Sequence, residues 1–181
     1  MDISRQTRNM RVAAAMLLLA AAPAFAYAAP DTAADTAAAV QVEIGELEQM
    51  REFKRMHGSA RRDTEQSIRR LGEWLAGRAE RMLEPGQQLH VLLRDVDLAG
   101  EFEPGRSMSL HDVRIVKDIY PPRIELHYRL SDAAGQVLDE GDAVLRDPAF
   151  LSTGGSRGSD ALRFEKRMLD DWLRERFGGK H

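Results

Sequence analysis

The clearest periodicity in the chain is a strict alternation of apolar and polar side chains over residues 123–130. Alternation of this kind is typical of a β-strand with one buried and one solvated face. Two prolines precede the segment and a turn-forming run follows it at 131–135, so we expect a partner strand over residues 136–146. The four residues predicted to share the buried face are Ile124, Leu126, Tyr128 and Leu130.

Further segments have the alternation or the composition of strands. They are residues 40–44, 89–98 and 113–117. Apolar side chains fall on both faces of the second segment, which predicts a central strand. Together with residues 124–130 and 137–145, these segments predict a mainly antiparallel sheet of about five strands.

Two segments have the three-to-four spacing of apolar residues that is typical of an amphipathic helix. We expect the first to begin at a cap on Asp63 or Thr64 and to run to about residue 83. The second begins at a cap on Ser159 or Asp160. The apolar stripe of this last helix is formed by Leu162, Leu169, Trp172, Leu173 and Phe177. The predicted fold class is therefore α+β, with both helices packed on one face of the sheet.

Two connecting segments are less regular. Residues 46–62 are rich in charge, with Met50, Phe53 and Met56 spaced at three, and fit either a short helix or a long connection. Residues 152–159 contain glycine and serine and no large apolar side chain, which indicates a mobile linker.

The first 28 residues have the features of a secretory signal peptide. Three arginines precede an apolar run at 12–22 that is too short to span a bilayer comfortably. Two overlapping Ala-x-Ala motifs follow and end at Ala26 and Ala28, where cleavage is expected. An uncleaved N-terminal anchor is the alternative.

This gives an expected organisation for the whole chain. It consists of a signal peptide over 1–28, a disordered lead over 29–39 and a single α+β domain over 40–178. After cleavage we expect no stable membrane span.

Charge and cysteine content bear on compartment and partners. The chain has 26 basic and 29 acidic residues, and residues 1–28 account for three arginines and one aspartate. Their removal leaves 23 basic and 28 acidic residues, a net charge near −5, which disfavours nucleic acid and anionic lipid as partners. The chain has no cysteine, so an exported domain would have neither a disulfide nor a lipoprotein anchor. These features favour a periplasmic protein whose partner is an envelope protein or a small ligand.

The most chemically suggestive stretch contains Asp95, Asp97, Glu101 and Glu103. Two aspartates at a spacing of two project from one face of a strand, and oxygen-rich clusters of this kind suit calcium, magnesium or acid–base chemistry. The alternative, which we favour, is structural. Asp95 would share a face with neighbouring apolar residues and accept hydrogen bonds from the backbone of the turn at Ala99 and Gly100. Arginines that could assist it are Arg94, Arg106 and Arg114.

Other constellations that carry chemistry are missing from the sequence. The five histidines have no zinc-binding spacing, no serine lies in a nucleophile elbow, and the glycine-rich segment at 154–158 lacks the P-loop lysine. We therefore predict no catalytic residue, no resident metal and no cofactor.

Three segments together resemble a known family. Residues 95–104 (DVDLAGEFEP), 118–124 (DIYPPRI) and 162–173 (LRFEKRMLDDWL) are similar to the bacterial family named domain of unknown function 3016. The likeness extends from about residue 40 to residue 177. It implies an exported protein of Gram-negative bacteria, with no assigned activity and no assigned catalytic residue.

Two functions fit these observations. The first is a non-enzymatic binding or envelope-assembly module, which the missing site chemistry favours. The second is a metal-dependent hydrolase that uses the four carboxylates of the acidic stretch, with His111 nearby in sequence. Convergence of the carboxylates in a pocket, with shifted pKa values, would favour the second function.

Overall fold

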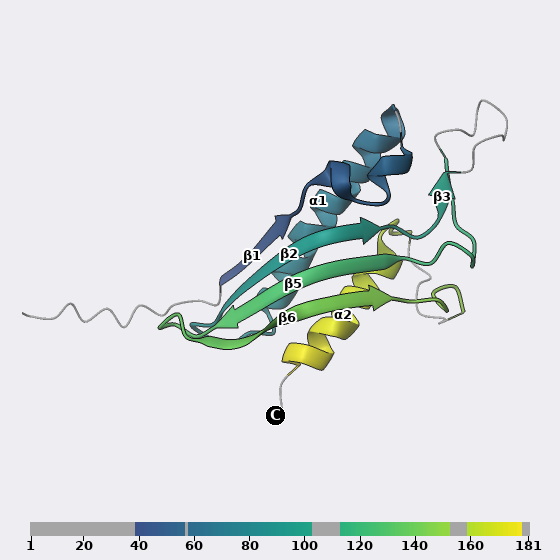
Figure 1. The fold of residues 1–181 in the computed structure, drawn as a ribbon. Coiled ribbons are helices and arrows are strands. Elements are labelled where there is room, and N and C mark those ends of the chain that lie inside the picture. The colour runs from purple at the N-terminus through teal and green to yellow at the C-terminus, as the bar shows by residue number, and fades with distance from the viewer. Residues whose placement is uncertain (1–38, 57, 103–112, 153–158, 179–181) are drawn as a thin grey trace, which may run out of the picture. The chain divides into compact units, whose positions relative to one another are not determined.

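The core of the fold is a four-stranded sheet in the order β1-β2-β5-β6 (Figure 1). The computed structural model describes residues 39–56, 58–102, 113–152 and 159–178, all within one structural unit. The strands of the sheet are β1 (Ala39–Ile44), β2 (Gln88–Asp97), β5 (Arg123–Ser131) and β6 (Val137–Arg146). Several predicted features lie outside the described residues: the signal peptide, the lead apart from Ala39, most of the linker, Glu103, Arg106 and His111. Ala39 is instead the first residue of β1.

β2 is a central strand, as its sequence predicts, and β5 has the predicted buried face. β2 pairs antiparallel with β5, and β5 pairs antiparallel with β6. β1, however, pairs with β2 in parallel, so the sheet is mixed. The reason is the intervening helix α1 (Ser59–Glu80), which returns the chain to the start of the sheet before β2 begins.

The main sheet has four strands instead of the expected five or so, because one predicted strand does not join it. Of the predicted strand at 113–117, only β4 (Arg114–Ile115) is extended and paired, and its partner is β3 (Glu101–Phe102) in a separate two-stranded sheet. β2 already bonds to β5 along its length, which leaves no position between them for a further strand. The apolar residues flanking β4 are accordingly exposed.

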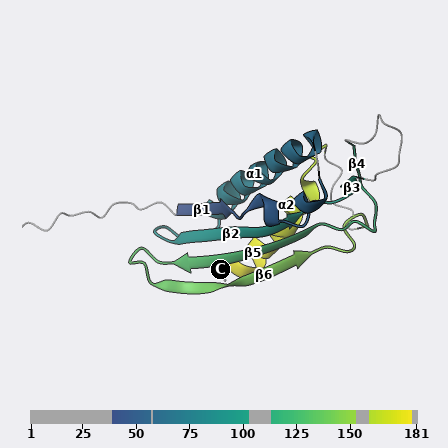
Figure 2. The same cartoon turned by 45° about the horizontal axis from the view of Figure 1, so that its top comes forward.

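Both helices pack on the same face of the sheet, as predicted. α1 packs against β1 and against α2 (Arg163–Phe177), which also packs against β6. In Figure 1 both lie behind the four strands, and Figure 2 shows α1 along one side of the sheet. The N-cap of α1 is Gly58 instead of Asp63 or Thr64, and the N-cap of α2 is Leu162 instead of Ser159 or Asp160. The apolar stripes of the helices predict that Trp74 and Trp172 are both largely buried. Trp172 is 7% exposed in the shared core, as predicted, whereas Trp74 is only half-buried at its margin.

The irregular segment before α1 folds as two 3₁₀ turns, η1 (Leu47–Gln49) and η2 (Phe53–Arg55). Met50, Phe53 and Met56 are all buried, and their spacing of three matches the three-residue period of this helix type. The segment therefore contributes side chains to the core and is not a solvated connection.

Among the described residues, neither helix combines the length and the apolar character that a membrane crossing requires.

Candidate functional site

The two aspartates of the acidic stretch lie on the outer face of the sheet, away from the helices. A bulge between Leu93 and Asp95 shifts the register of β2 against β5. Because one extra residue reverses which side chains point inward, Val96 is buried in place of Asp95. The expectation that Asp95 shares a face with Leu93 is therefore wrong.

Asp95 accepts hydrogen bonds, but from other donors than the sequence indicates. The backbone N–H of Arg51 donates to Oδ1 at 3.0 Å, and Nε of Arg51 lies 3.2 Å from Oδ2. Nη1 of Arg123 lies 3.4 Å from the same oxygen. Arg51 also pairs with Glu125 at 3.1 Å, so two arginines and two carboxylates form one ion-pair cluster. The turn at Ala99 and Gly100 takes no part in it.

The other two described carboxylates of the stretch, Asp97 and Glu101, line an open cleft of about 270 Å³ at the end of the sheet. Three arginines and a tyrosine from other segments complete its polar lining: Arg51, Arg123, Arg146 and Tyr120. Glu101 accepts a hydrogen bond from the N–H of Phe102 at 3.1 Å. The cleft thus presents cationic and anionic groups together.

Arg146 differs from the other two arginines of the cleft. Its side chain is exposed and makes no hydrogen bond or ion pair in the part of the chain that the structure describes. It lies opposite Arg123 in the β5–β6 register. A guanidinium of this kind can form a bidentate pair with a carboxylate or phosphate.

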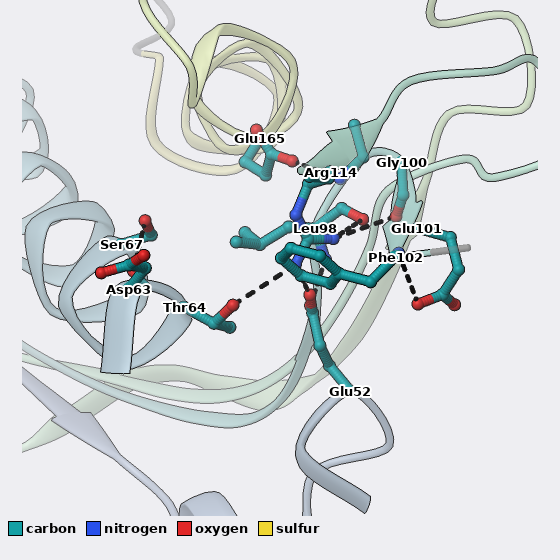
Figure 3. A network of polar contacts seen from close by, with 11 residues as sticks. Glu52, Asp63, Thr64, Ser67, Leu98, Gly100, Glu101, Phe102, Arg114 and Glu165 are labelled. Atoms are coloured by element: carbon teal, nitrogen blue, oxygen red, sulfur yellow. Dashed lines mark hydrogen bonds and ion pairs between the residues drawn. The ribbon is translucent and has the colours of Figure 1, made fainter. Parts of the chain in front are cut away.

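A buried network lies beside the cleft and centres on Arg114 (Figure 3). Nη1 of Arg114 donates to the carbonyl oxygens of Gly100 at 3.0 Å and Leu98 at 3.4 Å. Nη2 donates to the hydroxyl of Thr64 at 3.3 Å and forms an ion pair with Glu52. Burial lowers the pKa of Arg114 to about 10, although the nearby carboxylate of Glu165 opposes this shift.

Two buried carboxylates bind consecutive backbone amides at the end of β2. Glu52 accepts from the N–H of Leu98 at 2.7 Å, and Glu165 on α2 accepts from the N–H of Ala99 at 2.7 Å. Each of these glutamates is 1% exposed. Burial raises the pKa of Glu165, and the hydrogen bond from Ala99 only partly offsets that shift.

Gly100 completes this turn, at a position where no side chain can be accommodated. Its φ is +90°, and a Cβ there would lie 2.8 Å from the carbonyl oxygen of Ile115. Its N–H donates to the carbonyl of Tyr120 at 3.0 Å. The wall of the cleft at 98–100 is therefore fixed by bonds to several elements.

Glu52 and Glu165 are not predicted from the sequence, whereas Thr64 is predicted only as a possible helix cap and Arg114 only as a possible partner of Asp95. A signal was present in each glutamate's neighbours. Glu165 lies on the predicted apolar stripe of the last helix, three residues after Leu162, and Glu52 adjoins Phe53. A carboxylate at such a core position indicates a buried hydrogen-bonding role.

Within the described ranges, no group of three or more histidine and carboxylate side chains is arranged to bind a metal ion. Asp95, Asp97 and Glu101 are therefore not joined in one such group, and Glu103 lies outside the described residues. The observations add no support to the hydrolase hypothesis.

Comparisons with known proteins give the following similarities. No curated protein matches the chain. Among solved structures, a dodecamer of a PelC variant from Paraburkholderia phytofirmans is similar over 81% of this chain and 88% of that chain, with 11% identity and a TM-score of 0.37. A family model described as "Protein of unknown function (DUF3016)" matches residues 38–175. The chain belongs to this family.

Proposed function

We propose that the protein is a non-enzymatic binding module of the bacterial envelope, and that it binds its ligand in the cleft at the end of the sheet. One observation carries the proposal. Charged groups from separate segments converge in an open cleft whose wall is fixed by buried hydrogen bonds, and Arg146 lies there with no partner among the described residues. Preorganised polar groups in a concave site are typical of ligand recognition.

The placement of the carboxylates favours binding over catalysis. A carboxyl group serves acid–base chemistry near neutral pH best when the substrate can reach it and its pKa is raised. Glu165 has a raised pKa, but it is 1% exposed. The carboxylates that do line the cleft, Asp97 and Glu101, lie there together with three arginines, an arrangement that suits the binding of a charged ligand.

The lining also bears on the kind of ligand. Three guanidiniums and two carboxylates suit a polar compound or a partner segment with both kinds of charge. An envelope protein and a small periplasmic ligand both meet this description. Export to the periplasm is part of the proposal and rests on the apolar run and the Ala-x-Ala motifs near the N-terminus.

Binding assays on the purified full-length chain test this function. Amino acids, dicarboxylates and short charged peptides are screened by thermal shift and then by two-dimensional NMR. We expect at least one compound to move the amide resonances of 97–101, Ile119, Tyr120 and Arg123, and Asp97→Asn to weaken the binding of that compound about tenfold. The matched control is Asp63→Asn, an exposed aspartate on α1 whose loss should leave affinity unchanged.

Two outcomes would overturn the proposal. One is the absence of any compound that moves the resonances of the cleft. The other is chemical turnover of a bound compound that Asp97→Asn or Glu165→Gln abolishes, which would establish an enzyme.

A further inference from the structure

The sheet ends at β6 with one side of its backbone unpaired. β6 is the last strand in the order β1-β2-β5-β6. Apart from its ladder with β5, no residue of β6 makes a backbone–backbone hydrogen bond in the described part of the chain. Alternate N–H and C=O groups on the outer edge are therefore open to another extended segment.

A groove runs between this edge and α2. It has a volume of about 440 Å³, and its walls include Val144 and Arg146 of the strand and Met168, Trp172 and Glu175 of the helix. α2 runs antiparallel to β6, because Asp139 pairs with Arg176 at 2.7 Å while Asp147 pairs with Arg167 at the other end. These ion pairs tie α2 to both ends of the strand, and Figure 1 shows α2 behind the sheet, crossing β6 at an angle.

Large apolar side chains are exposed along this edge. Val137, Leu138 and Val144 are 37%, 50% and 61% exposed, although they lie on a strand of the main sheet. An exposed apolar edge strand tends to pair with another chain unless charges, a proline, a bulge or a covering segment block the edge. The side chains of an added strand would alternate between these residues and the helix side of the groove.

Two charged groups at the groove are unpaired in the part of the chain that the structure describes. Neither Arg146 nor Glu175 makes a hydrogen bond or an ion pair among the described residues, and both lie at its lining. The other charges of the lining are paired, Asp147 with Arg167 and Asp171 with Arg174. A ligand that is complementary to these two charges would carry one acidic group and one basic group.

We infer that the groove between β6 and α2 binds an extended peptide segment of a partner protein by strand addition. The peptide pairs its backbone with the outer edge of β6 and directs alternate apolar side chains toward Met168 and Trp172. An acidic residue of the peptide pairs with Arg146, and a basic residue pairs with Glu175. This inference does not depend on the cleft, with which the groove shares Arg146.

A second copy of the chain fits the edge less well than a foreign peptide. β6 carries Asp139, Glu140 and Asp142 but only one cation, Arg146. Pairing two copies of β6 would bring the acidic residues of both strands together, and like charges on paired strands are destabilising.

The test starts from a random library of twelve-residue peptides displayed on phage and selected on the purified full-length chain. We expect the recovered peptides to alternate apolar and polar positions and to carry one acidic and one basic residue. As capped synthetic peptides, they should move the amide resonances of β6 and of 167–175. A proline in the middle of the peptide should abolish binding, because it removes a donor and breaks the strand.

Charge reversal gives the decisive control. Glu175→Arg should weaken a selected peptide about tenfold or more, and a peptide with its basic residue changed to glutamate should bind the variant again. Glu73→Arg, on the exposed side of α1, serves as the matched control and should not change affinity. Asp97→Asn should also leave the peptide affinity unchanged, which separates this site from the cleft.

Three results of the peptide experiments would overturn the inference. They are selection of peptides without an alternating pattern, resonance changes confined to the cleft or the outer face of the sheet, and failure to recover any peptide. A concentration-dependent dimer in light scattering, lost in Val144→Asp, would identify a second copy as the occupant instead.

Discussion

Glu165 on α2 accepts a 2.7 Å hydrogen bond from the backbone N–H of Ala99, at the point where β2 ends and the turn beside the cleft begins. The adjacent N–H, of Leu98, donates to Glu52 in the same way. Two carboxylates from distant parts of the chain therefore set the conformation of one turn. The cleft depends on this turn, because Leu98, Gly100 and Glu101 form part of its lining.

The stability of the protein should depend on pH through Glu165. Its pKa is raised above the ordinary value of 4.5, so the folded protein holds this proton more tightly than the unfolded chain does. The stabilisation that Glu165 gives the folded protein through this proton is fully present below pH 4.5. It declines as the pH rises toward the pKa of Glu165 in the folded state. In Glu165→Gln this dependence is absent, so the stability of the variant relative to wild type should increase with pH. Urea unfolding of both proteins between pH 4.5 and pH 8 measures the difference in their unfolding free energies. A difference that does not change with pH would contradict the prediction.

Loss of the Glu52 charge should be strongly destabilising. In Glu52→Gln the side chain can still accept from Leu98, but Arg114, whose side chain is 19% exposed, loses its ion-pair partner. Breaking a buried pair typically costs about 3–5 kcal/mol of unfolding free energy. The matched control is Glu48→Gln, which breaks an exposed pair with Arg61 and should cost less than about 1 kcal/mol. Equal losses in the two variants would mean that the buried pair contributes no more than the exposed one.

The two tryptophans should differ in their contribution to stability. Trp172 is buried between the helices and the sheet, with its ring edge-to-face to Tyr128 at 5.5 Å and to Phe177 at 5.5 Å. Trp172→Ala should cost about 3–5 kcal/mol in urea unfolding. Trp74 lies at the margin of the core, so Trp74→Ala should cost clearly less. A loss below about 1 kcal/mol for Trp172→Ala would show that α2 is not docked on the sheet.

Asp95 should prove structural. Its side chain is 13% exposed and bound by Arg51 and Arg123, so Asp95→Asn should lower the unfolding free energy by about 1–3 kcal/mol. Calcium, magnesium and zinc should leave the melting temperature of the wild type unchanged, since the described residues form no ion site that would stabilise the folded state by mass action. A melting temperature that rises with one of these ions, and no longer does so in Asp97→Asn, would instead favour a metal-dependent enzyme.

The mature protein should begin at Tyr27 or Ala29. Both positions follow an Ala-x-Ala motif at the end of the apolar run. Intact-mass measurement of the exported protein distinguishes the two cleavage sites. Recovery of the full-length chain from the membrane fraction would indicate an uncleaved anchor.

Several elements follow from the sequence by itself, because they depend on local periodicity. The alternation at 123–130 predicts β5 and its buried face, and the three-to-four spacing around Trp172 predicts the last helix and its burial. Three segments also identify the family that the family model confirms. In the cleft, Asp97 and Glu101 come from the stretch that the sequence singles out as chemically suggestive.

Only the tertiary structure decided how these elements combine. The parallel position of β1, the pairing of β4 with β3 and the bulge at Asp95 depend on hydrogen bonds between segments, which leave no local pattern. The amides of Leu98 and Ala99 bind glutamates 46 and 66 residues away, and the arginines of the cleft come from three separate segments. Side-chain spacing reports which face of an element is buried, but a contact between distant segments depends on the packing of the whole domain.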